Sequence, residues 1–167
     1  VENGKVSKVR VDMGEPILEP EKIPVISDND RVINEPITVG GKEWKMTCVS
    51  MGNPHAVVFV DNVADFEIEK YGPLFEKNER FPKRTNTEFV EIKSEEEAIM
   101  RVWERGSGIT MACGTGACAS AAAAIKAGFC SSPVDVVLDG GTLHIELSEN
   151  QARMTGPAVT VCDCIVE

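Results

Sequence analysis

Cys113 stands just ahead of Gly114 and Gly116, in a stretch that we interpret as a loop turning into a helix. Glycines let the backbone approach a ligand closely and adopt positive φ. The free N–H groups at a helix start bind anions, and the helix dipole adds to that attraction. The same field favours a thiolate over a thiol. The pattern therefore predicts that Cys113 is a base or a nucleophile.

An inert role for the same thiol is the alternative. Free cysteine is among the most buried residue types, and most buried cysteines do no chemistry. We interpret Cys118, one turn into the expected helix, as such a packing residue. For Cys113 both interpretations stay open at this point.

A dinucleotide site is a second alternative for this stretch. Gly114, Gly116 and Ala119 fit the pattern G-x-G-x-x-A, and Asp139 follows an apolar, strand-like run. That fingerprint needs a parallel βαβ unit around it. The run 139–141 (Asp-Gly-Gly) is typical of a hairpin turn instead, so we expect the strand after it to be antiparallel.

Three further loops carry polar residues at the start or end of expected strands: Asn53 with His55, then Asn86, then Glu104 with Arg105. Taken singly, each has a structural explanation as an Asx turn, a turn cap or a surface ion pair. Together they suit a zwitterionic substrate. Arginine binds a carboxylate with two hydrogen bonds, while carboxylate and amide oxygens accept from an ammonium group.

The elements that must position these residues follow from hydrophobic periodicity. Helical spacing predicts helices over 63–77 and 117–125, the second apolar on nearly every face and therefore buried. Alternation and turn signals predict strands over 6–11, 37–39, 43–49, 56–60, 87–92, 98–104, 134–138, 143–147, 152–155 and 158–166. This order predicts an α+β fold in which a curled, largely antiparallel sheet surrounds a buried central helix.

Composition narrows the class of protein. The 167 residues suit one domain, or one domain with extra arms, and 43% of them are hydrophobic. A net charge of −10 argues against nucleic acid and anionic membrane surfaces as partners. No apolar run reaches transmembrane length, and the first residues do not resemble a signal peptide. The spacing of the six cysteines matches no zinc site. Without a secretory signal, we expect reduced thiols and a cytoplasmic location.

Four motifs, in this order along the chain, resemble the diaminopimelate epimerase family. They are Met-Gly-Asn-Pro-His-Ala-Val at 51–57, Phe-Pro at 81–82 with Asn-Thr-Glu-Phe-Val at 86–90, Arg-Val-Trp-Glu-Arg-Gly at 101–106, and Ala-Cys-Gly-Thr-Gly-Ala-Cys-Ala at 112–119. The similarity extends along essentially the whole chain. One departure is Ile109-Thr110, where the family usually has an acidic or amide residue before the threonine.

The resemblance implies two pseudo-symmetric domains, each a curled sheet around a central helix with one catalytic cysteine at its start. Cys113 matches the second cysteine. The first belongs to a Cys-Gly-Asn-Gly motif, which this sequence does not contain. We therefore expect the C-terminal epimerase domain over 14–158, with 1–13 and 159–167 as arms that belong to the sheet of a missing N-terminal domain.

The resemblance also implies a function: inversion of LL-diaminopimelate to meso-diaminopimelate by two cysteines, with no cofactor and no metal. One thiolate removes the α-proton, and the other thiol delivers a proton to the opposite face. Helix-start N–H groups of Gly114 and Thr115 would stabilise the charge on the α-carboxylate. The remaining roles fall on Asn53, Asn86, Glu104 and Arg105 for substrate binding, and on His55 and Glu104 for tuning the protonation of the cysteines.

Two other functions stay open. The first is a related amino-acid racemase or isomerase of the same fold, such as a proline racemase relative. The second is a non-catalytic binding domain, which applies if this chain is the whole gene product. The expected partners are diaminopimelate, the missing N-terminal domain and a second copy of the chain in a homodimer.

Overall fold

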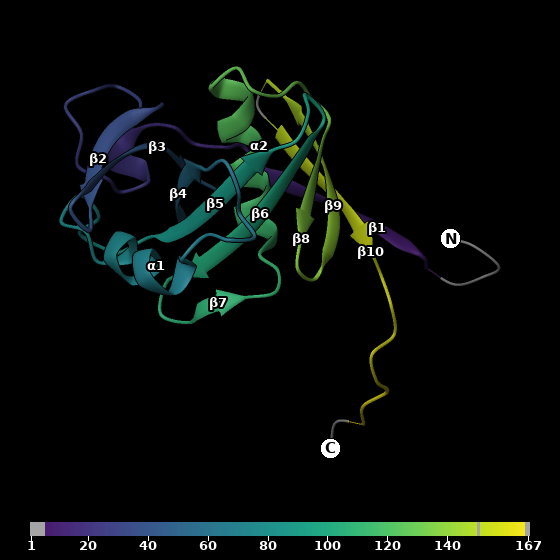
Figure 1. Cartoon of the computed structure of the whole chain (residues 1–167). Helices are drawn as coiled ribbons and strands as arrows, with labels where there is room; N and C mark the ends of the chain where they lie inside the picture. Colours follow the sequence, from purple (N-terminus) through teal and green to yellow (C-terminus); the bar gives the residue numbers. More distant parts are fainter. Residues whose placement is uncertain (1–5, 150, 166–167) are drawn as a thin grey trace.

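The computed structural model describes residues 6–149 and 151–165. Two α-helices and a short 3-10 helix, Pro20–Lys22, join a set of ten strands in this part of the chain (Figure 1). The elements in chain order are β1 (Lys8–Gly14), β2 (Glu35–Val39), β3 (Lys42–Ser50), β4 (Pro54–Phe59), α1 (Ile68–Glu76), β5 (Asn86–Ile92), β6 (Glu97–Glu104), β7 (Gly108–Thr110), α2 (Gly114–Lys126), β8 (Val134–Leu138), β9 (Gly141–Ser148) and β10 (Gln151–Pro157).

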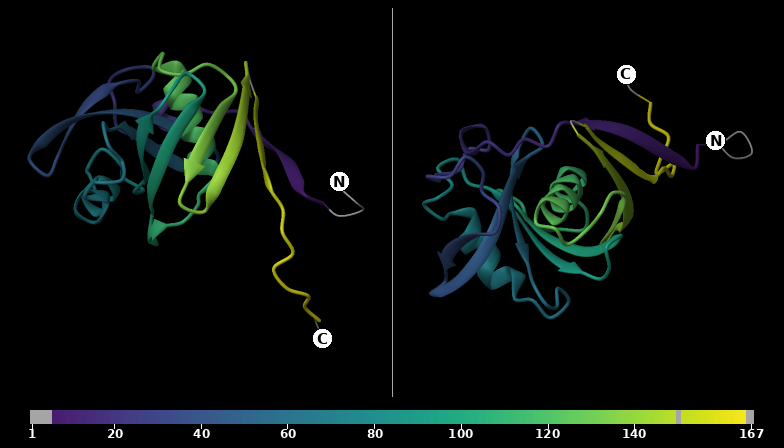
Figure 2. Two further views of the ribbon diagram at one scale, coloured as in Figure 1. Left: turned by 45° about the vertical axis from the view of Figure 1, so that its right-hand side comes forward. Right: turned by 90° about the horizontal axis from the view of Figure 1, so that it is seen from above.

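All ten strands belong to one sheet, with the order β1-β10-β9-β8-β6-β5-β4-β3-β2 and with β7 paired to β6. The β4·β5 and β6·β8 pairs are parallel, and the other strand pairs of the described residues are antiparallel. The sheet curls around α2, which lies in its hollow (Figure 2). The expected fold, a largely antiparallel curled sheet around a central helix, is confirmed.

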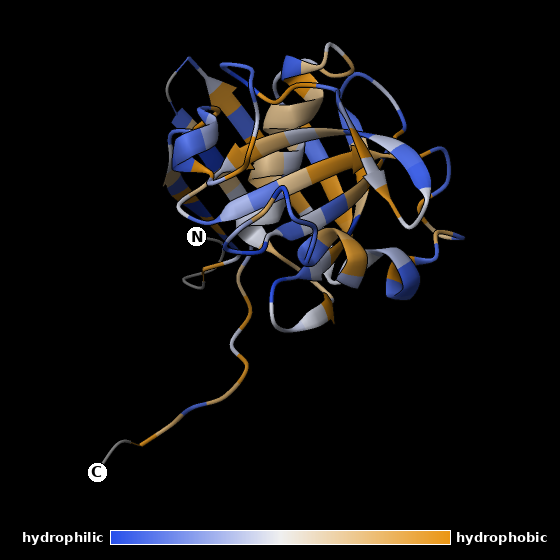
Figure 3. Ribbon diagram, turned by 90° about the vertical axis from the view of Figure 1, so that its left-hand side faces the viewer, coloured by the Kyte–Doolittle hydropathy of each residue, from blue (hydrophilic) through white to orange (hydrophobic). Residues whose placement is uncertain are grey.

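Small side chains let α2 sit at the centre of this sheet. Residues 116–124 of the helix are all buried, and six of these nine are alanine. They pack against branched side chains from several strands, among them Val57, Val102, Val136 and Ile145. Because alanine adds so little width to a helix, the strands of the curled sheet approach α2 closely. Figure 3 shows this apolar helix in the middle of the fold.

Strand periodicity divides the sheet residues between two cores. On β5, Val90 packs in the cluster around α2, whereas Phe89 packs on the other face with Phe75 of α1 at a ring distance of 5.6 Å. Successive strand side chains point to opposite faces, so Glu88 and His55 share the α2 side with Val90 and Val57. This parity decides which polar residues can reach the start of α2.

Helix α1 is shorter than predicted. The sequence predicts a helix over 63–77, but α1 spans Ile68–Glu76. The preceding residues form a turn in which the Asn62 side chain accepts from the N–H groups of Ala64 and Asp65. An Asx turn of this kind competes with helical hydrogen bonding, which explains the later start.

The turns confirm the hairpins and exclude the dinucleotide interpretation. Gly40 and Gly41 both adopt positive φ between β2 and β3, and Leu138 pairs with Gly141 across the β8–β9 turn. The strand directly before the Cys113 loop is β7, which pairs with β6 and is not adjacent to β8. The strand before the glycine loop and the strand after the helix are therefore not parallel neighbours, as the dinucleotide-binding unit requires.

The two ends of the chain differ from their predictions. The strand predicted over 6–11 is β1, Lys8–Gly14, and it pairs with β10 at the edge of the sheet. The strand predicted over 158–166 is wrong for 158–165, which have no strand pairing, and residue 166 lies outside the described residues. The register of β1 against β10 ends with Lys8 opposite Pro157. One further backbone hydrogen bond, from the Ala158 N–H to the Ser7 carbonyl over 3.0 Å, follows this pair.

The helices of the described residues are too short or too polar to span a membrane.

Candidate active site

Cys113 caps the N-terminus of α2 with its side chain. Its backbone is extended, with φ −143° and ψ 104°, and its Sγ accepts a hydrogen bond of 3.3 Å from the N–H of Gly116. The Thr115 hydroxyl lies 3.6 Å from the same sulfur. The first N–H groups of a helix have no partner inside it, so those of Gly114 and Thr115 are available at this end of α2. The Cys113 side chain is 8% exposed and lies just below the surface.

The surroundings of Cys113 favour the thiol, which differs from the expectation based on the helix start. Burial is the largest effect and raises the pKa of Cys113; the carboxylates of Glu88 and Glu104 raise it further. The hydrogen bonds from Thr115 and Gly116 lower this pKa but do not outweigh the burial. The sequence shows the helix start but not these two acidic neighbours. Cys118, by contrast, is fully buried in α2, and burial raises its pKa to about 12, as expected of a packing residue.

A buried acid–imidazole pair lies beside the start of α2. Nδ1 of His55 on β4 lies 2.7 Å from Oε1 of Glu88 on β5, and both side chains are fully buried. Burial raises the pKa of Glu88, although the His55 charge and hydrogen bond oppose the rise. Oε2 of Glu88 has no hydrogen-bond partner among the described residues. Glu88 is absent from the predicted site. Its position two residues before Val90, on the same face of a buried strand, could have indicated that its side chain points toward α2.

Asn53 connects this pair to the helix start. Its Oδ1 lies 3.0 Å from Nε2 of His55, and its Nδ2 donates to the Thr115 hydroxyl over 3.3 Å. The predicted residues Asn53, His55, Thr115 and Cys113 are therefore joined in one hydrogen-bond chain.

The glycine spacing of the helix start follows from this packing. A Cβ on Gly116 would lie 2.8 Å from Oε1 of Glu88 and 3.1 Å from Sγ of Cys113. A Cβ on Gly114 would meet only the flexible end of Met154, at 3.3 Å. Packing against Glu88 and Cys113 therefore explains why residue 116 is a glycine, without any need for a phosphate-binding loop.

Asn86 joins two of the predicted loops. Its Nδ2 donates to the carbonyl of Pro54 over 2.9 Å, and its Oδ1 accepts from the N–H of Arg105 over 2.8 Å. The side chain is 5% exposed, so this residue positions its neighbours as much as it faces a ligand. The Arg105 side chain is exposed, and its Nη1 donates to the carbonyl of Lys83 over 2.9 Å.

Glu104 ends β6 beside the hairpin to β7, and its carboxylate accepts a hydrogen bond from the Thr110 hydroxyl. Ile109 is 36% exposed on β7. The loop that departs from the family pattern at Ile109 therefore keeps a polar contact to Glu104 through Thr110. The charge of Glu104 is one of the smaller effects that raise the pKa of Cys113.

Glu76, at the end of α1, supports the loop that carries Glu104 and Arg105, although the sequence did not point to it. Its buried carboxylate accepts from the Trp103 indole over 2.7 Å and from the Gly106 N–H and Arg84 guanidinium over 3.1 Å each. These donors hold the pKa of Glu76 below its usual range despite its burial. A glutamate on an amphipathic helix looks solvent-exposed in sequence, so nothing there distinguishes Glu76 from its neighbours.

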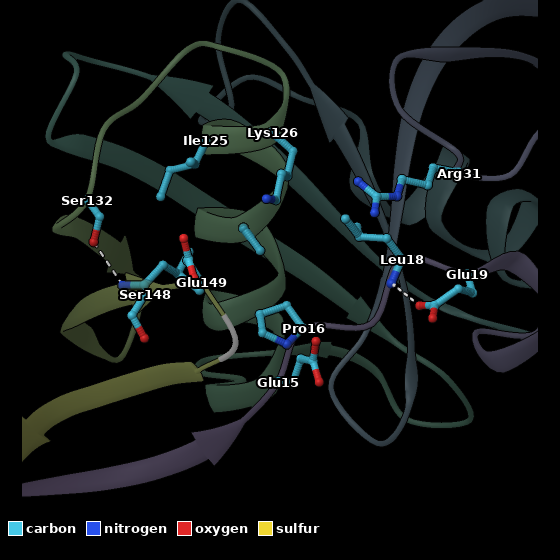
Figure 4. Close-up of a pocket in the computed structure, with 12 residues that line it drawn as sticks. Glu15, Pro16, Leu18, Glu19, Arg31, Ile125, Lys126, Ser132, Ser148 and Glu149 are labelled. Atoms are coloured by element: carbon cyan, nitrogen blue, oxygen red, sulfur yellow. Dashed lines mark hydrogen bonds between the residues drawn. The ribbon is translucent and has the colours of Figure 1, made fainter.

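A cavity of about 410 Å³ lies at the opposite end of α2 (Figure 4). It is lined by Ile125 and Lys126 of the helix together with Leu18, Arg31 and Ser148. None of the predicted site residues lines it.

Comparison with known proteins places this chain in a family. The diaminopimelate epimerase family model matches residues 47–161. Diaminopimelate epimerase of Agathobacter rectalis is 62% identical over 170 residues, which cover 96% of this chain and 60% of that protein. The enzyme of the same name from Methanococcus maripaludis is 55% identical over 163 residues, covering 96% of this chain and 59% of the relative. The chain thus spans about 60% of the length of these relatives.

Solved structures show a similar fold at low sequence identity. A probable proline racemase from Agrobacterium radiobacter has a TM-score of 0.67 and 15% identity, covering 97% of this chain and 56% of that one. A protein described as a predicted epimerase from Pseudomonas aeruginosa has a TM-score of 0.60 and 16% identity, covering 98% and 62%. The sequence relatives go further than the fold: this chain belongs to the diaminopimelate epimerase family.

Proposed function

We propose that the complete protein containing this chain converts LL-diaminopimelate to meso-diaminopimelate without a cofactor, and that Cys113 is one of its two acid–base groups. The observation that carries this proposal is the position of Cys113 at the start of α2, with its Sγ accepting from the Gly116 N–H and beside the Thr115 hydroxyl. The names and the high identity of the sequence relatives support the substrate.

The chemical problem is the weak acidity of the α-hydrogen of an amino acid. The substrate α-carboxylate would accept hydrogen bonds from the N–H groups of Gly114 and Thr115, which lie at the positive end of α2. These donors stabilise the negative charge that develops on the carboxylate as the α-proton leaves. Cys113 Sγ, at the same helix end, would then face the α-carbon.

The surroundings of Cys113 support the thiol as one of its two working states, because burial and two carboxylates raise its pKa. As the thiol, Cys113 would deliver a proton to one face of the α-carbon. The S–H bond breaks, a Cα–H bond forms, and Cys113 is left as the thiolate. A second cysteine, outside this chain, would take the original α-proton from the other face. In the opposite direction the two cysteines exchange roles.

Recognition of the distal, non-reacting centre falls to Asn53, Asn86, Glu104 and Arg105. Asn86 ties the loop after β3 to the loop after β6, so the groups that bind the substrate are positioned together. Arg105 is exposed and suited to the distal carboxylate, while the oxygens of Glu104 and Asn53 suit the distal ammonium.

The division of the complete protein forms part of this proposal. Residues 14–158 would be the C-terminal epimerase domain, and 1–13 and 159–167 would join the sheet of an N-terminal domain that carries the second cysteine. The β1·β10 edge and the exposed side chains of Val159, Val161 and Ile165 support this assignment, because such surfaces favour pairing with further chain. The chain alone would then be inactive. The free thiols suit a cytoplasmic location.

Deuterium incorporation at the α-carbon tests this function. The complete protein in D₂O should label diaminopimelate at Cα while interconverting its isomers, and it should leave proline and lysine unlabelled. Labelling of proline in preference to diaminopimelate would favour the proline racemase alternative. Absence of labelling for all three substrates would favour a binding domain.

A further inference from the structure

Five side chains form an unbroken hydrogen-bond chain from a buried acid to the Cys113 sulfur. Glu88 and His55 are 2.7 Å apart, His55 and Asn53 3.0 Å, Asn53 and Thr115 3.3 Å, and Thr115 and Cys113 3.6 Å. The residues come from β4, β5, the N-cap and first turn of α2, and the loop between β3 and β4. The acid end is fully buried, while the sulfur end lies just below the surface.

The hydrogen-bond chain can run in two directions, because the imidazole, the hydroxyl and the thiol can each donate or accept. In the first direction, the Asn53 amide donates through Nδ2 to the Thr115 hydroxyl, and its Oδ1 accepts from Nε2–H of His55. The Thr115 hydroxyl then donates to the Cys113 sulfur. Together with the Gly116 N–H, this gives the sulfur two donors, an arrangement that suits a thiolate.

This direction requires a proton between His55 and Glu88. When Nε2 of His55 carries a hydrogen, the contact between Nδ1 and Oε1 needs a second proton, on either the ring or the carboxyl group. If that proton is on the Cys113 sulfur instead, the hydrogen left on the ring faces the Glu88 carboxylate, and Nε2 becomes an acceptor. The Asn53 amide is then turned over, so that its Nδ2 donates to Nε2 and its oxygen accepts a hydrogen bond from the Thr115 hydroxyl. The Thr115 oxygen is left to accept from the Cys113 S–H.

We propose that Glu88 is a positioning residue for Cys113: its shared proton with His55 sets the direction of this hydrogen-bond chain, and that direction selects thiolate or thiol. The two states hold the same number of protons. In one, the negative charge is on Cys113 and the acid–imidazole pair is protonated; in the other, the charge is on Glu88 and Cys113 is the thiol. The inference rests on the proposed function only for the acid–base role of Cys113.

Two other groups near the Cys113 sulfur, Glu104 and Cys118, are not part of this hydrogen-bond chain. The Glu104 carboxylate, at the end of β6, accepts from the Thr110 hydroxyl and acts on Cys113 through its charge alone. Cys118 lies one turn further along α2, in the apolar core. Among the described residues, the charges of Glu88 and Glu104 act on Cys113, His55 reaches it through the hydrogen-bond chain, and Cys118 is the neighbouring thiol.

The test is the pH dependence of Cys113 alkylation in the complete protein, measured without substrate by iodoacetamide labelling and peptide mass spectrometry. Glu88→Gln removes the negative charge and keeps the shape, so the inflection for Cys113 should move down by about one pH unit or more. Glu43→Gln, at an exposed position on β3, is the matched control and should leave the inflection in place.

A second pair of variants separates the hydrogen-bond chain from charge acting through space. Thr115→Val removes the last link, so it should raise the inflection of Cys113 and reduce the effect of Glu88→Gln to less than half in the double variant. Thr115→Ser keeps the hydroxyl and should retain the full effect. An equal shift in the Thr115→Val background, or none in Glu88→Gln, would overturn the proposal. If Glu88→Gln fails to fold, an unchanged inflection in Thr115→Val alone overturns it.

These outcomes are independent of turnover. If Cys113 titrates as described but the protein labels no diaminopimelate, the proposed function is refuted and the role of Glu88 in the hydrogen-bond chain still stands. A protein that epimerises normally, with a Cys113 titration that ignores Glu88, would refute only the role of Glu88.

Discussion

The Trp103 indole N–H donates to Oε2 of Glu76 over 2.7 Å, and this bond fixes the end of α1 to β6 directly before Glu104 and Arg105. Gly72 allows the contact, because a Cβ there would lie 2.5 Å from the Trp103 ring. The helix therefore serves the candidate site from a distance: it holds the loop that carries two of the predicted substrate-binding residues.

Replacing Glu76 should loosen that loop. In Glu76→Gln, one amide oxygen must replace two carboxylate oxygens that accept from three donors, so at least one donor loses its partner. We expect a cost of about 1–3 kcal/mol in the free energy of unfolding. We also expect a KM for diaminopimelate raised several-fold, with a smaller change in kcat, measured in the complete protein. Glu79→Gln, at an exposed position in the turn after α1, is the control. An unchanged KM in Glu76→Gln would show that the loop holds its shape without this carboxylate.

The two glycines at the start of α2 should respond differently to alanine. Alanine normally stabilises a helix relative to glycine by about 1 kcal/mol. At Gly116 the new methyl group would overlap Glu88 and Cys113, so Gly116→Ala should lower the free energy of unfolding by about 1–3 kcal/mol. In Gly114→Ala the new methyl group contacts only the flexible end of Met154, so the free energy of unfolding should change little. Urea unfolding of both variants checks this pair, and equal stability of the two would contradict the packing argument.

Much of this fold can be predicted from the sequence, because its signals are local. The alanine-rich helix and the alternating strands 87–92 and 98–104 carry their periodicity in their own residues. The segment 158–166 also alternates, yet 158–165 form no strand, because a strand needs a neighbour and periodicity cannot supply one. The site divides in the same way. Cys113, Asn53 and His55 lie in recognisable motifs and carry polar groups at loops or strand starts. Glu88 also lies in a motif, at 86–90, but it and Glu76 contribute through burial and through partners that are distant in sequence.

Stability should fall with pH above about 8.5 because of the buried thiols. An unfolded cysteine titrates near about 8.5, whereas burial strongly raises the pKa of Cys48 in the folded chain. Above about 8.5 the unfolded state therefore binds fewer protons than the folded state, and each such thiol lowers the free energy of unfolding by up to about 1.4 kcal/mol per pH unit. Below that pH its contribution is fully present.

Urea unfolding between pH 8 and 10 measures this slope. Cys48→Ala should make it shallower, whereas Cys162→Ala, which removes an exposed thiol, should not. A slope that is the same in all three proteins would exclude Cys48 as a source.

Cys118 should matter for packing and not for chemistry. Its side chain is fully buried in α2, so Cys118→Ser places a hydroxyl among apolar groups. We expect a loss of about 1–3 kcal/mol in the free energy of unfolding. The variant that remains folded should keep its kcat for diaminopimelate in both directions. A fall in kcat with unchanged stability would assign Cys118 a direct part in the reaction.

The most direct test of the central claim is α-deuterium incorporation by Cys113→Ser in the complete protein, measured from each diaminopimelate isomer in D₂O. Serine keeps the size of the side chain but is far harder to deprotonate than cysteine. We predict that turnover falls in both directions by a factor of about 10² or more. Substrate should still bind, since Asn53, Asn86, Glu104 and Arg105 are unchanged. Near-normal turnover in Cys113→Ser, or a larger loss in folded Cys118→Ser, would contradict it.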